Sequence, residues 1–325
     1  MLYADDAGIV SKSAEGLAKM MTVIVTVFDA AGLTVSENKT ETMLLRTPNQ
    51  ALRTSPLVIE AAGQRYRQTM QFLYLGGLVN ASADIMPEIK RRIQLAWACY
   101  NRFKRELYDM EAAPFALKVR MLKAEVMETL LYGCVTWTLG QEHFAELRTA
   151  HHKLLLRTIG FQRRQRTDHL MSYAKALKKA RCESVETTIR KRRLLFAGAV
   201  QRMTNERLTR RVMFGTMAGG ENPGLGRPEN NCAQCLADDL RLFKATQGST
   251  ESSPLLFGVE TVLWPRAAKN RGKWYRGVVE AADGFMTRWQ RLEAERSWIR
   301  HAAEDAKSGD KRKRKEGEGE GEEAT

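Results

Sequence analysis

QFLYLGGLVNASADIMPEIKRRIQLAWACYNRFKREL, residues 71–107, decides the fold, because the period of its apolar residues changes within it. Up to Asn80, apolar and aromatic residues around a pair of glycines are typical of a strand that turns. Beyond Asn80 the apolar residues return every three or four positions, which predicts a helix. Its apolar side comprises Ile89, Ile93, Ala96, Tyr100, Phe103 and Leu107, and off that side lie Lys90, Arg91, Arg102, Lys104 and Arg105. We expect this helix to pack on one side and to be basic on the other.

The residues before this stretch predict short strands around one helix. Ser13 is a suitable N-cap for a helix whose apolar residues recur from Leu17 to Ala31, and Gly32 is a natural stop. An acidic pair, Asp5 and Asp6, should lie at or near the tip of a first hairpin. The predicted strands are 2–4 with 8–10, 42–45, 57–60 with a partner around Tyr66, and 72–77.

The rest of the chain predicts helices separated by loops. Helical spacing ends near Gly133 and again before Gly160, and the compositions of 218–228 and 246–254 are those of linkers. Residues 307–325 are low in complexity, first basic and then Gly/Glu-alternating, and bury too little to order themselves. The prediction is an α+β, mostly α fold in five parts: strands and a helix (1–80), helices (81–165), basic helices (166–217), a C-terminal helical region with Gly/Pro-rich linkers (218–306) and a disordered charged tail (307–325).

Charge predicts a polyanionic partner. The 325 residues carry a net charge of +14, and residues 86–215 alone hold 27 Lys and Arg against 12 Asp and Glu. An excess of this size favours RNA or DNA as the partner, bound against the helical middle of the chain. The longest apolar run is too short to span a membrane, and no signal peptide is evident. Five cysteines without framework spacing fit the cytoplasm or nucleus.

Tyr3-Ala4-Asp5-Asp6 is the motif with the clearest chemical meaning. Nucleotidyl transfer uses two divalent metals, and Mg²⁺ requires carboxylate oxygens of the kind that a hairpin tip would present. Taken alone, an Asp-Asp pair is far more often a solvated turn. The motif nevertheless resembles the catalytic box of reverse transcriptases, and the resemblance extends through most of the chain.

The sequence after this box resembles the polymerase of non-LTR (LINE-type) retrotransposons. Residues 32–43 look like the next polymerase motif, except that Ser36 replaces the usual Asn, and the resemblance places Lys39 near the incoming dNTP. The alternative is an exposed lysine before a strand. Residues 72–76 resemble the strand that holds the primer end, with Phe72, Tyr74, Leu75 and Gly76 as its primer-grip-like residues, and an ordinary core hairpin is the alternative.

The helical region continues the resemblance with some departures. Residues 88–96 and 130–137 match a thumb-like segment, although Val135 replaces the commoner Glu. Residues 193–203 match more weakly, because Phe196 and Ala199 stand where the family has Trp and His, while Gly198, Arg202 and Met203 are retained. From the charge pattern, the candidate phosphate ligands are Lys90, Arg91, Arg102 and Arg105.

Two further pairs of residues are expected to be structural and not to bind a metal. Cys232 and Cys235 have zinc-like spacing but no second pair of ligands, so they are expected to be ordinary helix cysteines. His151 and His152 are adjacent, so their rings should diverge on a helix and lie at the surface or at a groove edge. Residues 311–315 (KRKRK) are either a nuclear-import signal or a solvated charge run.

The resemblance implies part of an RNA-directed DNA polymerase that uses Mg²⁺ and dNTPs. In the family, a further metal-binding aspartate and the fingers precede the Tyr-x-Asp-Asp box, so this chain is expected to be inactive alone, with an incomplete palm followed by the thumb-like helices. The alternative is a non-catalytic basic protein that binds nucleic acid, or a decaying retroelement relic.

Overall fold

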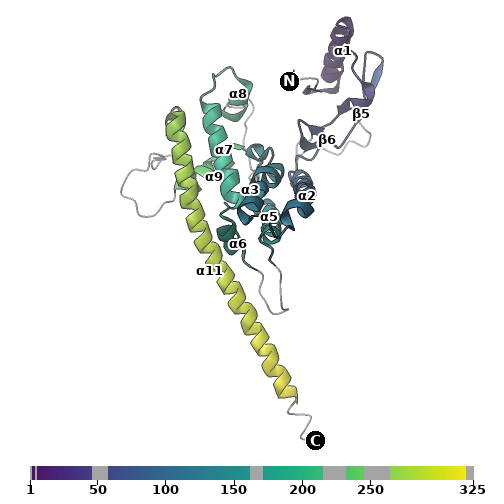
Figure 1. Ribbon diagram of the computed structural model, residues 1–325. Coiled ribbons are helices and arrows are strands. Elements are labelled where there is room, and N and C mark those ends of the chain that lie inside the picture. Colours follow the sequence, from purple (N-terminus) through teal and green to yellow (C-terminus); the bar gives the residue numbers. More distant parts are fainter. Residues whose placement is uncertain are drawn as a thin grey trace. The chain divides into compact units, whose positions relative to one another are not determined.

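A computed structural model describes residues 2–3, 6–45, 58–161, 171–214, 232–244 and 264–319, and the side chains among 300–319 are described only at Ala302. The chain divides into two compact units, Met1–Arg91 and Arg92–Thr325. Among the described residues, strands lie in the first unit alone and helices dominate the second (Figure 1). The predicted α+β, mostly α fold is therefore confirmed.

The first unit begins with a hairpin and a helix. Strands β1 (Leu2–Tyr3) and β2 (Asp6–Ala7) pair antiparallel, with Tyr3 opposite Asp6. Helix α1 (Ala14–Ala30) starts where predicted, because the Ser13 side chain accepts a hydrogen bond from the backbone N–H of Gly16 at 3.0 Å. The chain leaves α1 through Gly32, whose φ of +75° favours glycine.

Two small sheets complete the first unit. The first has the order β3-β5-β4, in which β3 (Glu41–Thr42) pairs parallel with β5 (Gln64–Gln68) and β5 pairs antiparallel with β4 (Ile59–Ala61). The second is the hairpin of β6 (Gln71–Tyr74) and β7 (Gly77–Asn80). The β4–β5 and β6–β7 hairpins have two-residue turns with positive φ at both positions, a geometry that matches the twist of paired strands. Alternating side chains of β4 and β5 pack on Met21 of α1, in a core of Met21, Ile59, Ala61 and Tyr66.

The helix predicted from the deciding stretch is α2 (Met86–Arg102), followed by the π-helical turn η2 (Lys104–Tyr108). Its predicted apolar side is correct at its centre, since Ile89, Ala96 and Tyr100 are buried. Tyr100 also stacks on Tyr108 with ring centroids 4.0 Å apart, so it belongs to the core, as expected.

The second unit is helical among its described residues. Its elements are α3 (Phe115–Met121), η3 (Leu122–Val126), α4 (Met127–Leu130), η4 (Cys134–Thr136), α5 (Gln141–Ile159), α6 (Tyr173–Ala180), α7 (Val185–Gln201), α8 (Leu208–Phe214), α9 (Cys232–Lys244), α10 (Trp264–Ala268) and α11 (Arg271–Gly319). The predicted stops are confirmed, because Gly133 and Gly160 adopt φ of +74° and +69° where α4 and α5 end. A core at α7, α9, α10 and α11 includes Leu194, Leu240, Phe243, Trp264 and Trp274.

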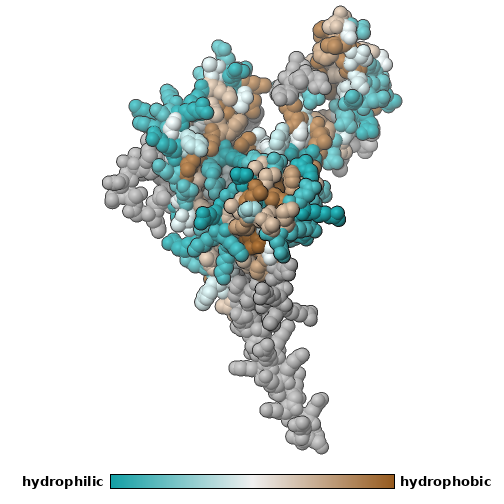
Figure 2. Space-filling view, in the orientation of Figure 1, coloured by the Kyte–Doolittle hydropathy of each residue, from teal (hydrophilic) through white to brown (hydrophobic). Residues whose placement is uncertain are grey.

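Several predicted segments need separate statements. The linkers at 218–228 and 246–254 lie outside the described residues, and the five-part division stays a prediction. Helix α11 continues to Gly319, past residue 307, where the composition predicted that a disordered tail begins. The Lys, Arg and Glu residues of this stretch have high helix propensity even without an apolar face to pack. In the described parts of the chain, every helix is too short or too polar to cross a bilayer. Figure 2 shows mainly hydrophilic side chains on the visible face, with smaller hydrophobic areas among them.

Candidate nucleic-acid interface

Of the acidic pair in the first motif, the structure describes Asp6 alone. Asp6 is exposed in the first position of β2, and Asp5 lies outside the described residues. Within the described ranges, no three His, Cys, Asp or Glu side chains gather closely enough to hold a metal. Mg²⁺ requires several carboxylate oxygens, and Asp6 is the one residue of the predicted pair that the structure describes, so Mg²⁺ binding stays a prediction.

Lys39 is presented at the end of a short 3-10 helix. This helix, η1 (Glu37–Lys39), is held to β5 because Glu37 Oε1 accepts a hydrogen bond from the backbone N–H of Arg65 at 3.1 Å. Lys39 itself is exposed. Its position near a triphosphate stays a prediction.

The primer-grip-like residues form a hairpin that lies against the acidic one. Phe72 and Tyr74 share one face of β6, with ring centroids 6.5 Å apart and an edge-on contact. The ring of Tyr74 approaches the backbone after β2, since a Cβ placed on Gly8 would lie 3.1 Å from Tyr74 Oη. Leu75 and Gly76 form the turn, with φ of +48° and +77°. The structure thus brings two of the predicted motifs together within the first unit.

One of the candidate phosphate ligands is engaged within the protein. Arg91 Nη1 donates to the backbone oxygen of Gly76 at 3.3 Å and lies 3.4 Å from Glu88 Oε2. The same carboxylate oxygen accepts from the backbone N–H of Leu78 at 3.0 Å. Arg91 and Glu88 therefore attach the start of α2 to the β6–β7 hairpin, a structural role that the charge pattern did not predict.

The other three candidates are exposed. Lys90 and Arg105 project into solvent. Arg102 is 65% exposed, although it lies 3.9 Å from Glu125 and over the ring of Phe103 at 4.7 Å. Phosphate contacts by these side chains stay a prediction.

The weakly matching segment 193–203 holds two helices together. Gly198 allows α11 to approach α7 closely, because a Cβ at this position would lie 2.1 Å from Trp274 Nε1. That indole nitrogen donates to the backbone oxygen of Leu194 at 3.0 Å. Arg202 Nη1 donates to the backbone oxygen of Ala268 at 2.8 Å. These retained residues act in packing.

Of the two positions predicted for His151, the surface is wrong, because this side chain is 1% exposed, whereas His151 does line a groove together with Arg181 and Lys191. Tyr173 Oη lies 2.7 Å from His151 Nδ1 and accepts from the backbone N–H of Val185 at 3.2 Å, so its own proton is free to donate to the imidazole. Burial and, as a smaller cause, the adjacent His152 together lower the pKa of His151 to about 3. The neutral ring is thus a core component that joins α5, α6 and α7. The half-buried His152 donates instead to the backbone oxygen of Met171 at 2.8 Å.

Cys232 and Cys235 occupy the first turn of α9. Cys235 is buried, and burial raises the pKa of its thiol, which disfavours the thiolate that a metal needs.

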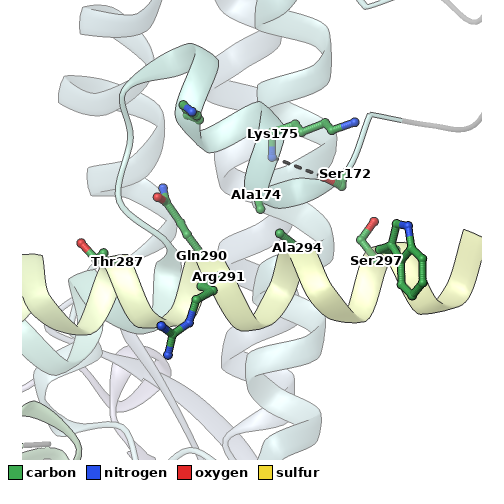
Figure 3. Close-up of a pocket in the computed structure, with 10 residues that line it drawn as sticks. Ser172, Ala174, Lys175, Thr287, Gln290, Arg291, Ala294 and Ser297 are labelled. Atoms are coloured by element: carbon green, nitrogen blue, oxygen red, sulfur yellow. Dashed lines mark hydrogen bonds between the residues drawn. The ribbon is translucent and has the colours of Figure 1, made fainter. Parts of the chain in front are cut away.

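A basic groove runs between α6 and α11 in the second unit (Figure 3). It has a volume of about 530 Å³, and its charged lining residues are all cations: Lys175, Lys178 and Arg291. Ser172 and Ser297 line it as well, and the Ser172 hydroxyl caps α6 by accepting from the backbone N–H of Lys175 at 3.3 Å. In Figure 3, Gln290 extends from α11 toward α6, whereas the Arg291 guanidinium lies on the other edge of α11.

An aromatic contact holds the two walls of the groove together, and a second aromatic ring, that of Trp298, is exposed at the groove. Tyr173 of α6 contacts Trp289 of α11 edge-on, with ring centroids 5.5 Å apart. Trp298, a lining residue two turns after Arg291, is 73% exposed. Exposed aromatic rings among cations are the components of surfaces that bind single-stranded nucleic acid.

Sequence reasoning missed this groove. The charge excess of residues 86–215 covers Lys175 and Lys178 but not Arg291 or Trp298. The available signal was Trp298 itself, because a tryptophan in the polar, charged part of a helix has no apolar stripe to join.

One relative of the chain is named as derived from a mobile element. The chain is 25% identical over 209 residues to a protein of Caenorhabditis elegans that is named as transposon-derived, and the match covers 64% of this chain and 73% of that protein. No family model matches the chain, and no solved structure matches it either. The similarity fits the predicted retrotransposon origin in its coarser form, a transposon-derived protein.

Proposed function

We propose that this chain derives from the reverse transcriptase of a non-LTR retrotransposon and binds RNA or DNA through the phosphate backbone. The observation that carries the proposal is the α6–α11 groove, whose charged lining residues are all cations. The cations of such a groove neutralise phosphates, and the nucleic acid then releases its condensed counterions. The groove would therefore bind nucleic acid without base specificity. A nuclear or cytoplasmic location is part of the proposal.

Binding is proposed in preference to nucleotidyl transfer by this chain alone. The described residues bring no group of three metal-ligating side chains together, whereas two-metal catalysis needs several carboxylates. We therefore expect no templated dNTP incorporation by the purified chain with Mg²⁺ or Mn²⁺. Primer extension on an RNA template that disappears in Asp6→Asn would refute this expectation.

Salt titration of a double variant tests the binding proposal. Each phosphate contact with a single strand contributes about 0.7 to the log–log salt slope, so Lys175→Gln with Lys178→Gln should flatten the slope by about 1.4. The same arithmetic predicts a roughly 20-fold loss of affinity at about 0.1 M salt. The matched control, Arg65→Gln with Arg67→Gln, removes two exposed cations from β5 in the first unit. Equal losses in the two variants, or affinity that is insensitive to salt, would contradict the proposed site.

A further inference from the structure

We infer that the α6–α11 groove prefers single-stranded nucleic acid and that Trp298 stacks on an unpaired base. The inference rests on the proposed function and names the form of nucleic acid that the groove selects. Its basis is one juxtaposition: a 73% exposed indole at a groove whose charged lining residues are all cations.

The cations are placed to follow a phosphate backbone beside the ring. Lys175 and Lys178 are three residues apart on α6, so they project from the same face of that helix. Arg291 and Trp298 are seven residues apart on α11, which places them two turns and about 10 Å from each other along the axis. A strand in the groove would therefore meet the two lysines on the α6 wall, the Arg291 guanidinium at the far edge of α11, and an aromatic ring farther along that helix.

An unpaired base is the ligand that such a ring distinguishes. In a duplex the base faces are covered by their neighbours, so a protein ring at the surface reaches only sugar and phosphate. In a single strand every base exposes a π-face, and stacking on Trp is favourable whatever the sequence. Exposing an indole to water has no packing benefit for the folded chain, whereas stacking would remove its apolar area from water.

A protein occupant fits the groove less well. A second copy would bring a chain of net charge +14 toward the three cations. An acidic peptide would satisfy the lysines but offers no planar face of the size of a base for Trp298. The test includes a polyglutamate competitor for this reason.

Fluorescence anisotropy with three labelled probes tests the inference: a thymidine oligomer, the same oligomer as a duplex, and an abasic strand that keeps only sugar and phosphate. For Trp298→Ala we expect roughly a 10-fold or larger loss of affinity for the thymidine oligomer. Affinity for the duplex and the abasic strand should not change, and neither should the salt slope. Trp298→Phe, which keeps a ring, should recover most of the loss.

The outcomes separate this inference from the proposed function. If wild-type protein binds none of the three probes, both fail. If it binds them with the expected salt slope but Trp298→Ala has unchanged affinity for the oligomer, only the stacking inference is refuted. An equal loss on the abasic strand, or displacement of the oligomer by polyglutamate as readily as by unlabelled oligomer, would overturn it too. Trp298 is exposed, so the variant should keep the wild-type circular dichroism spectrum, and a loss of helical signal would show a structural role instead.

Discussion

The buried His151 should make the stability of the second unit depend on pH. Its pKa is lowered from 6.5 to about 3, first by burial and then by His152. The unfolded chain therefore binds a proton that the folded chain excludes over this interval, so stability increases with pH and is lost as pH falls from about 6.5 toward 3. The neutral ring is favoured in the folded state because the side chain is 1% exposed, and its Nδ1 lies 2.7 Å from the Tyr173 hydroxyl.

The size of the effect follows from the two pKa values. Each pH unit below the unfolded pKa costs about 1.4 kcal/mol for one proton. At pH of about 5, one and a half units below 6.5, the free energy of unfolding should be lower than at neutral pH by about 2 kcal/mol from this histidine.

Tryptophan fluorescence during urea unfolding measures this quantity in the relevant unit, because all six tryptophans lie between Trp97 and Trp298. His151→Asn removes the titrating group and leaves an amide oxygen that can accept from Tyr173. We expect its free energy of unfolding to lose about 2 kcal/mol less than that of the wild type between neutral pH and about pH 5. Leu155→Val is the matched control on the same helix, since it removes one buried methylene without removing a proton site.

Two results would refute the reasoning. One is a pH dependence that is the same in His151→Asn and in the wild type. The other is a lower pH sensitivity in Leu155→Val, because any loss of core stability would then reproduce the effect. Parallel curves for Leu155→Val and the wild type, displaced only in height, are expected.

Three further predictions concern a packing contact, a buried ion pair and a helix cap. Gly198→Ala should lower the free energy of unfolding by about 2 kcal/mol in the same urea assay, because overpacking against Trp274 outweighs the better helix propensity of Ala; an increase in stability would contradict the close approach. Asp239→Asn should cost about 3 to 5 kcal/mol, because it leaves the buried Arg193 guanidinium, now 2.6 Å from Asp239 Oδ2, without a counter-charge; a midpoint unchanged in urea would argue against the ion pair. Ser13→Ala should destabilise α1 by about 1 kcal/mol, with faster amide exchange in its first turn, and unaltered exchange there would exclude the cap.

Local signals in the sequence predicted the elements well. The change of period after Asn80 located the transition from strands to helices, and glycines marked helix ends because their left-handed backbone has no steric cost. Ser13 was identifiable as a cap from residue type alone. These features depend on a few neighbouring residues, which sequence patterns record directly.

Contacts between distant segments were not predictable in the same way. Arg91 and Arg102 look alike in the sequence, yet Arg91 binds Gly76 while Arg102 is 65% exposed. The burial of His151 depends on Tyr173, which is 22 residues away. The α6–α11 groove joins residues more than a hundred positions apart, and neither wall alone predicts a binding site.

Two sets of contacts between helices explain why the proposed binding surface does not depend on the acidic motif. Gly198 and Arg202 fix α7 to the segment around α10 and α11, and the contact of Tyr173 with Trp289 fixes α6 to α11. All of these contacts, and the α6–α11 groove, lie within the second unit, whereas Asp6 lies in the first. A substitution at Asp6 would therefore leave the groove intact. The nucleic-acid binding that we propose for the second unit therefore does not depend on the β1–β2 hairpin.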